Sequence, residues 1–166
     1  MQPLLSPRIV GAQAVVVDER GFVLLQLRLW PAGWEPPGGH VARGEDPRHT
    51  VVRETEEETG LRIEVERLTG RYRFQGIRRG TDAVFRAKAV GGRLTPTREA
   101  RRLSFVDPEH LPRSLFPWYH RRIQDALAEA GQGVAERVQH VGPGDVLGHG
   151  LRLSLDLASW AARRPG

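Results

Sequence analysis

The sequence predicts an α/β fold of the α+β type, in which short strands and two helices share one domain. Short stretches rich in β-branched and aliphatic residues alternate with clusters of Gly, Pro and Asp, as expected of strands joined by turns. Two longer segments, 46–60 and 119–131, carry the apolar spacing and end signals of helices. The chain has 166 residues, which is enough for one domain with a hydrophobic core.

The chain begins with two predicted strands. Residues 9–17 are rich in Val and indicate a buried strand, and residues 22–28 indicate a second one. The segment 18–21 between them is typical of a turn, so we expect the two strands to form a β-hairpin. Residues 29–37 contain two Trp and three Pro, which predicts an irregular loop.

The next segment carries the clearest helix signals of the chain. Asp46 can cap the helix N-terminus, and Pro47 then occupies the first helical position, where its missing N–H costs nothing. Gly60 suits the left-handed turn that ends a helix. The sequence therefore predicts a helix between Asp46 and Gly60.

This helix carries four glutamates, and three of them share one side. At about 100° per residue, Glu54, Glu57 and Glu58 fall within an arc of about 100° beside the packing face, whereas Glu56 points elsewhere. Crowded carboxylates repel one another unless a cation neutralises them, and Mg²⁺ prefers oxygen ligands of this kind. A solvated acidic face remains the alternative at this point.

The remaining elements up to residue 131 follow in order. A strand is predicted at 61–65, and residues 66–74 continue it or pair with it. A turn at 75–82 and a strand at 83–90 follow, and Gly91-Gly92 break that strand. Another strand is predicted at 99–106, a short helical turn at 107–112 and a covering helix at 119–130, which Gly131 ends.

The last 35 residues are predicted to extend the main domain. We expect residues 1–131 to form that domain and residues 132–166 to pack on it or in a dimer contact, because so short a tail is below ordinary domain size. Within the extension, the pattern predicts a strand or short helix, a loop, a strand and a terminal helix, at 134–141, 142–150, 151–157 and 157–164.

Composition limits the class of protein. The chain has no Cys, which excludes disulfides and Cys-based zinc sites. Its net charge of +5 suits polyanionic partners, although the near-exclusive use of Arg over Lys is better explained by the base composition of the genome than by selection for binding. The N-terminus has no leader pattern and no stretch is long enough to cross a membrane, so we expect a soluble, cytoplasmic protein without a membrane partner. His40 and His49 are expected to be surface residues.

The segment 39–61 resembles the Nudix box, Gly-x5-Glu-x7-Arg-Glu-U-x-Glu-Glu-x-Gly-U, where U is aliphatic. The fixed positions are occupied by Gly39, Glu45 and the pairs Arg53-Glu54, Glu57-Glu58 and Gly60-Leu61. The one departure is Thr55, whose methyl group can still pack where the family prefers an aliphatic residue. The resemblance implies an α/β/α sandwich with a mixed central sheet, the box loop and helix at the site, and a C-terminal covering helix.

The resemblance also implies a metal-dependent hydrolase that cleaves a phosphoanhydride bond in a nucleoside diphosphate linked to another group. Mg²⁺ or Mn²⁺ would be the cofactor. Glu57 and Glu58 would be its main ligands, with Glu54 as a ligand or the general base and the Gly38 carbonyl as a further ligand. Glu99 is the alternative base. Arg53 would orient a carboxylate and Glu45 would support the same network.

Substrate choice is less closely defined by the sequence. Extra motifs of several subfamilies are missing, which favours a (d)NTP or a modified nucleotide. An RNA 5′ end and a non-catalytic, nucleotide-binding regulatory module remain alternatives, and the chain is expected to be a monomer or homodimer. Arg28, Trp34 and Arg78 are candidates for substrate contact. For Trp34, stacking on a nucleobase and covering the core are equal alternatives; covering is favoured for Trp30, and an exposed hairpin tip for Arg78.

Overall fold

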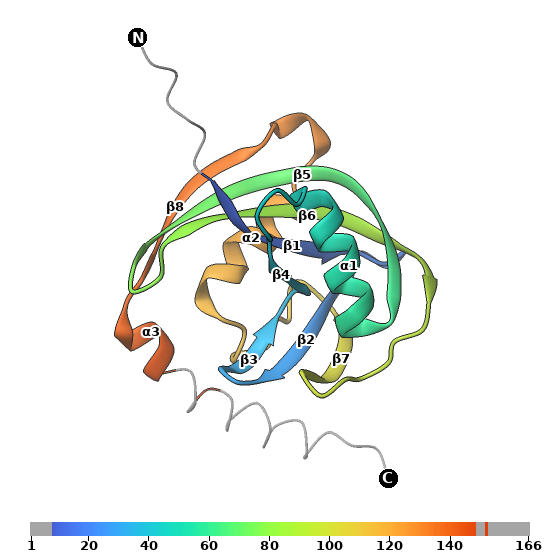
Figure 1. The fold of residues 1–166 in the computed structure, drawn as a ribbon. Helices are drawn as coiled ribbons and strands as arrows, with labels where there is room; N and C mark the ends of the chain where they lie inside the picture. Colours follow the sequence, from blue (N-terminus) through green and yellow to red (C-terminus); the bar gives the residue numbers. More distant parts are fainter. Residues whose placement is uncertain (1–7, 149–151, 153–166) are drawn as a thin grey trace.

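The computed structural model describes residues 8–148 and residue 152, which form two β-sheets and the helices packed on them (Figure 1). In chain order the elements are β1 (Ile9–Val16), β2 (Val23–Leu29), β3 (Ala32–Glu35), β4 (Gly38–His40), α1 (Pro47–Thr59), β5 (Leu61–Gly76), β6 (Gly80–Gly92), β7 (Ala100–Val106), α2 (Pro117–Leu127), the 3₁₀ turn η1 (Ala130–Gln132), β8 (Ala135–Val141) and α3 (Pro143–Leu147).

The larger sheet is mixed, as predicted. Its five strands lie in the order β4-β1-β6-β5-β8, with β1 parallel to β6, β8 parallel to β5, and the other two neighbouring pairs antiparallel. The smaller sheet has the order β3-β2-β7 and is antiparallel throughout. The predicted class, α+β with a mixed central sheet, is therefore confirmed.

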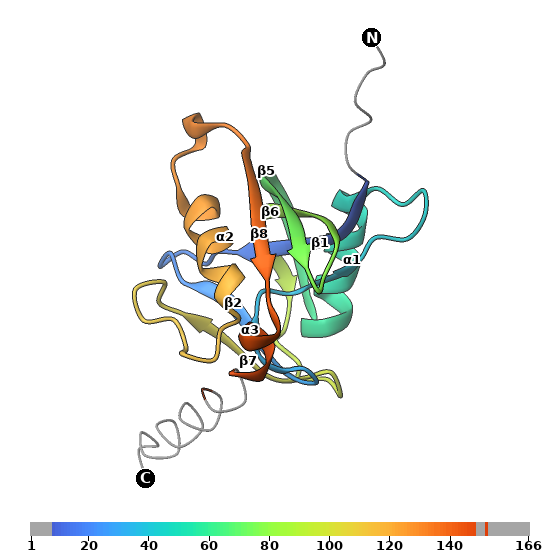
Figure 2. The same cartoon turned by 90° about the vertical axis from the view of Figure 1, so that its left-hand side faces the viewer.

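The helices α1 and α2 cover opposite faces of the larger sheet (Figure 2). Alternate residues of β1 enter two separate cores: Val15 packs in the cluster that contains Ile123 of α2, and Ala14 packs in the cluster that contains Val51 of α1. This alternation follows from the two-residue period of a strand. It places the box helix on one face of the sheet and the covering helix on the other.

The expected hairpin between the first two strands is wrong. β1 and β2 follow each other through a tight turn, but they belong to different sheets and meet only at an isolated bridge between Val17 and Val23. Both strands are buried along most of their length, because each pairs with other strands of its own sheet on both sides. β2 pairs instead with β3 and with β7.

The segment 29–37 is more regular than the sequence predicts. β3 pairs with β2 from Gln26 to Leu29, and β4 follows directly at Gly38. The prolines at 31, 36 and 37 all fall between the paired stretches, where a missing N–H removes no ladder hydrogen bond. Composition alone does not separate this arrangement from a loop.

Several boundaries also differ from the predicted ones. β6 runs through Gly91 and Gly92, which were expected to end it. α2 ends at Leu127, so Gly131 lies in η1 and does not cap the helix. The predicted helical turn at 107–112 is a single hydrogen-bonded turn, closed by the His110 N–H to the Asp107 carbonyl at 2.9 Å, and no helix forms there.

The extension contributes β8 to the larger sheet, and residues 143–147 of the expected loop form α3. The strand and helix predicted at 151–157 and 157–164 lie outside the described residues, apart from residue 152. Within the described part of the chain, no helix has both the length and the apolar character that crossing a bilayer requires.

Candidate active site

Helix α1 has the ends that the sequence predicts. The Asp46 side chain accepts a hydrogen bond from the backbone N–H of Arg48 at 2.8 Å, and Gly60 ends the helix in the left-handed region, at φ 76°. Thr55 is fully buried and donates its hydroxyl proton to the Val51 carbonyl at 2.7 Å. A Thr is therefore accommodated on the packing face without an unpaired polar group.

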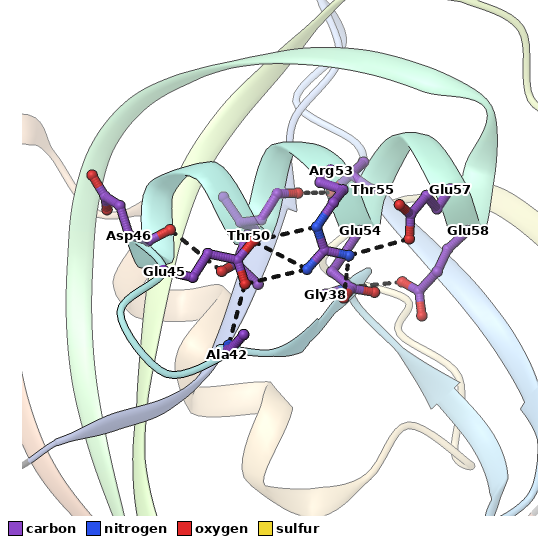
Figure 3. Close-up of polar contacts among 11 residues, drawn as sticks. Gly38, Ala42, Glu45, Asp46, Thr50, Arg53, Glu54, Thr55, Glu57 and Glu58 are labelled. Atoms are coloured by element: carbon purple, nitrogen blue, oxygen red, sulfur yellow. Dashed lines mark hydrogen bonds and ion pairs between the residues drawn. The ribbon is translucent and has the colours of Figure 1, made fainter.

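Arg53 lies at the centre of the acidic face of α1 (Figure 3). Its guanidinium donates to Glu54 at 2.8 Å and to Glu57 at 3.2 Å, both on the same helix. It also reaches back to Glu45 in the preceding loop, at 3.2 Å. Hydrogen bonds to Glu54 and then to Glu45 raise the pKa of Arg53 above its usual value. The guanidinium holds three carboxylates around one point.

Glu45 connects the box loop to this cluster. Its carboxylate accepts the backbone N–H of Ala42 at 3.2 Å, and this bond, ahead of the Arg53 contact, lowers the pKa of Glu45. The loop is thereby held against the helix face.

Glu58 differs from the other carboxylates because it is buried. Only 9% of the residue is exposed, and its carboxylate accepts the Gly38 N–H and the Gln26 side-chain amide, each at 2.9 Å. Burial, together with the nearby charges of Glu35 and Glu54, raises the pKa of Glu58 to about 7, despite these two hydrogen bonds. A cation beside Glu58 would remove this penalty.

The glycine pair before the box brings backbone and carboxylates together. A Cβ at Gly39 would lie 2.4 Å from the Glu54 carboxyl carbon, so the Glu54 carboxylate occupies the space that a side chain would fill. Gly38 has φ 152° and is pressed against β1, where a Cβ would lie 2.2 Å from the Ala12 carbonyl oxygen. Gly39 thus forms a cradle for Glu54, and the Gly38 N–H holds the Glu58 carboxylate.

The donor set of this cluster suits a hard divalent cation. Among the described residues, no three His, Asp or Glu side chains already stand at metal-holding separations. Glu54, Glu57 and Glu58 nevertheless line one cavity of about 290 Å³, and carboxylate oxygens are the ligands that Mg²⁺ and Mn²⁺ prefer. Glu99, the alternative base, lines the same cavity from the loop before β7. The residues present therefore fit the predicted metal.

A second cleft, of about 570 Å³, also adjoins the glycine pair. It lies between the β2–β3 hairpin, the β5–β6 turn and the start of α2, and both Gly38 and Gly39 line it. Arg28 and Arg78 line it as well, so two of the three predicted substrate contacts face one cleft. Arg78 also pairs with Asp82 at 3.2 Å, which fixes its guanidinium at the rim.

The structure decides between the two alternatives for Trp34 and contradicts the expectation for Trp30. Trp34 is only 7% exposed and packs in the core cluster with Leu115 and Phe116, so its ring has no free face for a nucleobase. Trp30 is 86% exposed, whereas it was expected to cover the core. The register of β3 decides this, because Trp34 lies opposite Leu27 and points inward with it.

Sequence reasoning missed Glu35, which forms part of the wall of the cleft. Its buried carboxylate accepts hydrogen bonds from Arg28 and from the Tyr119 hydroxyl, each at 3.2 Å. Burial raises the pKa of Glu35, and Arg28 and Tyr119 offset only part of that effect. Glu35 lies among Trp and Pro residues that indicated a loop, so no local signal distinguished it. Trp118, also missed, lines the cleft and stacks on Phe116 with centroids 5.0 Å apart.

Comparison with known proteins identifies the family of this chain. A model described as the NUDIX domain matches residues 7–127. A MutT-like protein of Streptomyces ambofaciens is 39% identical over 133 residues, which cover 80% of this chain and 83% of that protein. The chain belongs to the Nudix hydrolase family. Family membership and enzyme class are thus confirmed, and hydrolases of this family generally use divalent metal ions.

Other relatives extend the comparison. A Bacillus subtilis (strain 168) protein, provisionally named an 8-oxo-dGTP diphosphatase, is 30% identical over 115 residues, covering 69% of this chain and 77% of that protein. An ADP-ribose pyrophosphatase from Streptococcus suis superposes with a TM-score of 0.65 at 22% identity, over 81% of this chain and all of that one. At this identity the structural match concerns the Nudix fold alone.

Proposed function

We propose that this Nudix hydrolase uses a divalent metal ion to cleave a phosphoanhydride bond, with a nucleoside triphosphate or a modified nucleotide as its substrate. The observation that carries the proposal is the position of the Gly38–Gly39 pair. The pair contacts the carboxylates of Glu54 and Glu58, and it also lines the cleft that contains Arg28 and Arg78. A nucleotide in this cleft would present its phosphates to the acidic cluster.

In this proposal the residues of α1 and of the loops beside it have separate roles. Glu57 and Glu58 would hold Mg²⁺ or Mn²⁺, together with the backbone at Gly38. The bound ion would neutralise the phosphate charge and lower the pKa of the attacking water. Glu54 accepts the proton of that water, and Glu99 is the alternative because it lines the same cavity. Arg53 holds Glu54 and Glu57 in position, and Glu45 holds Arg53.

The cleft offers complementary groups for the rest of a nucleotide. Arg28 and Arg78 supply positive charge for phosphates, and a guanidinium can bind two phosphate oxygens at once. Trp118 offers an aromatic surface at the same cleft. The likeness to the Bacillus subtilis protein supports a modified nucleoside triphosphate as one member of the substrate class.

A nucleotide panel tests the proposal. Phosphate and pyrophosphate release is measured from dNTPs, 8-oxo-dGTP, nucleoside diphosphate sugars, ADP-ribose and diadenosine polyphosphates, with and without Mg²⁺. Metal-dependent release from nucleoside triphosphates is the expected result. No release from any of them, with nucleotide binding still measurable, would instead support a regulatory module that binds without cleaving.

A further inference from the structure

Gln26 is a fully buried polar residue in the middle of β2, between two leucines. It lies on the same side of the strand as Leu24, which packs in the core cluster that contains Val51 of α1. β2 is the central strand of the smaller sheet, so β3 and β7 hold it on both sides. Burying an amide is costly unless it is hydrogen-bonded, and an apolar side chain would serve packing alone better at this position.

The Gln26 amide is directed at two carboxylates. Its Nε2 donates to Glu58 Oε2 at 2.9 Å and, more weakly, to Glu35 Oε1 at 3.4 Å. The reverse orientation would place the amide oxygen against the oxygens of these two side chains, which accept hydrogen bonds when ionised. In the described part of the chain the amide oxygen has no hydrogen-bond partner. The carboxylates therefore decide how the amide is oriented.

The hydrogen bonds that hold Glu58 both reach the same oxygen of its carboxylate. Oε2 accepts the Gly38 N–H at 2.9 Å, a contact drawn in Figure 3, and it also accepts the Gln26 amide. No donor among the described residues reaches the other oxygen, Oε1. Glu58 lines the cavity of about 290 Å³ that Glu54 and Glu57 share. One carboxylate oxygen is thus fixed by the protein, and the other remains available to a ligand.

We propose that Gln26 is a positioning residue for the metal site, which fixes Oε2 of Glu58 and thereby leaves Oε1 for the divalent cation. The inference rests on the proposed metal-dependent function and adds to it a residue that would contact neither the metal nor the nucleotide. A partner that holds a metal-binding side chain sets its direction and favours its charged form. Because β2 is fixed within its sheet, Gln26 supplies this contact from a rigid position.

Thr69 of β5 provides a matched control for the loss of a buried polar contact. It is also buried, and its hydroxyl donates to the Val84 carbonyl at 3.0 Å. It does not line the cavity of the acidic cluster. Thr69→Val therefore removes a buried hydrogen bond away from the proposed metal site.

The test measures binding of Mn²⁺ alone to the whole chain, without nucleotide, by electron paramagnetic resonance at one fixed alkaline pH. Gln26→Met keeps the length of the side chain and removes the amide. It is expected to raise the Kd for Mn²⁺ by about 10- to 100-fold, the usual effect of losing a partner of a metal ligand. Thr69→Val is expected to bind Mn²⁺ as the wild type does.

A second variant and a second readout support this measurement. Gln26→Asn retains an amide but is too short to reach Glu58, so it is expected to weaken Mn²⁺ binding as well, even if Gln26→Met fails to fold. Thermal denaturation identifies the variants that are folded. In hydrolysis of the preferred nucleotide, the Mn²⁺ concentration that gives half-maximal activity is expected to rise by the same factor as the Kd.

Three results would overturn the positioning role: wild-type Mn²⁺ affinity in a folded Gln26 variant, an equal loss in Thr69→Val, or no Mn²⁺ binding by the wild type. These are separable from failure of the proposed function. If no nucleotide is hydrolysed but the Gln26 variants alone lose Mn²⁺ affinity, the hydrolysis is wrong and the positioning role stands. If nucleotides are hydrolysed and the Gln26 variants bind Mn²⁺ normally, only the positioning role is wrong.

Discussion

Among individual residues, Glu54 contacts three parts of the acidic cluster. Its carboxylate fills the space beside Gly39, accepts a hydrogen bond from Arg53, and lines the cavity shared with Glu57, Glu58 and Glu99. Its neighbour Glu56 is exposed and is absent from that cavity. The two side chains are chemically identical and lie on one helix, so they form a matched pair for testing the site.

Glu54→Gln is expected to lower kcat by about 10² to 10⁴ and to leave the fold intact, because the amide cannot accept the proton of the attacking water. Glu56→Gln serves as the control and is expected to retain full activity. Steady-state hydrolysis of the preferred nucleotide measures both. Near-normal turnover in Glu54→Gln would remove Glu54 from the mechanism and leave Glu99 as the base.

Gly39→Ala is expected to reduce activity without a large change in stability. The new methyl group would occupy the place of the Glu54 carboxyl group, which lies at the end of a flexible side chain and can move aside. We expect kcat to fall by at least about tenfold, since a catalytic group displaced by about 1 Å loses much of its effect. Gly131→Ala is the control because nothing lies within 4 Å of that position. Unchanged turnover in Gly39→Ala would contradict the cradle.

The raised pKa of Glu58 predicts that the stability of the metal-free protein depends on pH. Its pKa is about 7 in the folded protein against a usual value of 4.5, so the folded state binds the proton more tightly than the unfolded state. The free energy of unfolding therefore falls as pH rises from about 4.5 to 7. Glu58→Gln should stabilise the metal-free protein by about 2 kcal/mol at pH 8 and have little effect at pH 4. Urea denaturation at the two pH values measures this, and an equal effect at both would refute it.

Among the elements, α2 and β8 are connected through the carboxylate of Asp125. Asp125 of α2 accepts a two-pronged contact from Arg137 of β8, at 2.6 and 2.7 Å, and also accepts the Tyr72 hydroxyl at 2.8 Å. Burial acts to raise the pKa of Asp125, but the bonds from Arg137 and Tyr72 outweigh it and hold the pKa low. The carboxylate therefore stays charged and connects three elements.

Asp125→Asn is expected to destabilise the protein by about 1 to 3 kcal/mol at neutral pH, because a neutral amide cannot satisfy the Arg137 fork. Glu136→Gln removes a nearby partner that is 63% exposed and should cost less than about 0.5 kcal/mol. Chemical denaturation compares the two variants. An effect of Asp125→Asn no greater than that of Glu136→Gln would show that this contact does not hold β8.

At the scale of the whole molecule, a chain of polar contacts runs from β8 to the acidic cluster of α1. The Arg122 side chain is fully buried and bonds to Gln139 of β8 and to Gln13 of β1. Gln13 donates to the Tyr119 hydroxyl, which donates to Glu35. The Gln26 amide then bridges Glu35 and Glu58, at 3.4 and 2.9 Å. On this basis we infer that the part of the extension that forms β8 belongs to the main domain.

Gln139→Leu is expected to lower stability by about 1 to 3 kcal/mol, because it removes the acceptor of a buried guanidinium N–H. Val138→Thr, at an exposed neighbouring position, is the control and should change stability by less than about 0.5 kcal/mol. Thermal unfolding compares them. If Gln139→Leu unfolds at the wild-type temperature, β8 does not support the buried network.

The sequence by itself determined the box helix, its two ends and the carboxylates on one face, because caps, helical period and motif spacing act within about twenty residues. It also determined the class of fold and, through the box, the family. Only the tertiary structure decided which tryptophan is buried, that β1 and β2 separate into two sheets, and that Glu35, Trp118 and Arg28 meet in one cleft. These outcomes depend on strand register and on pairing between distant segments. A shift of one residue in β3 would exchange inward and outward side chains without any change in composition.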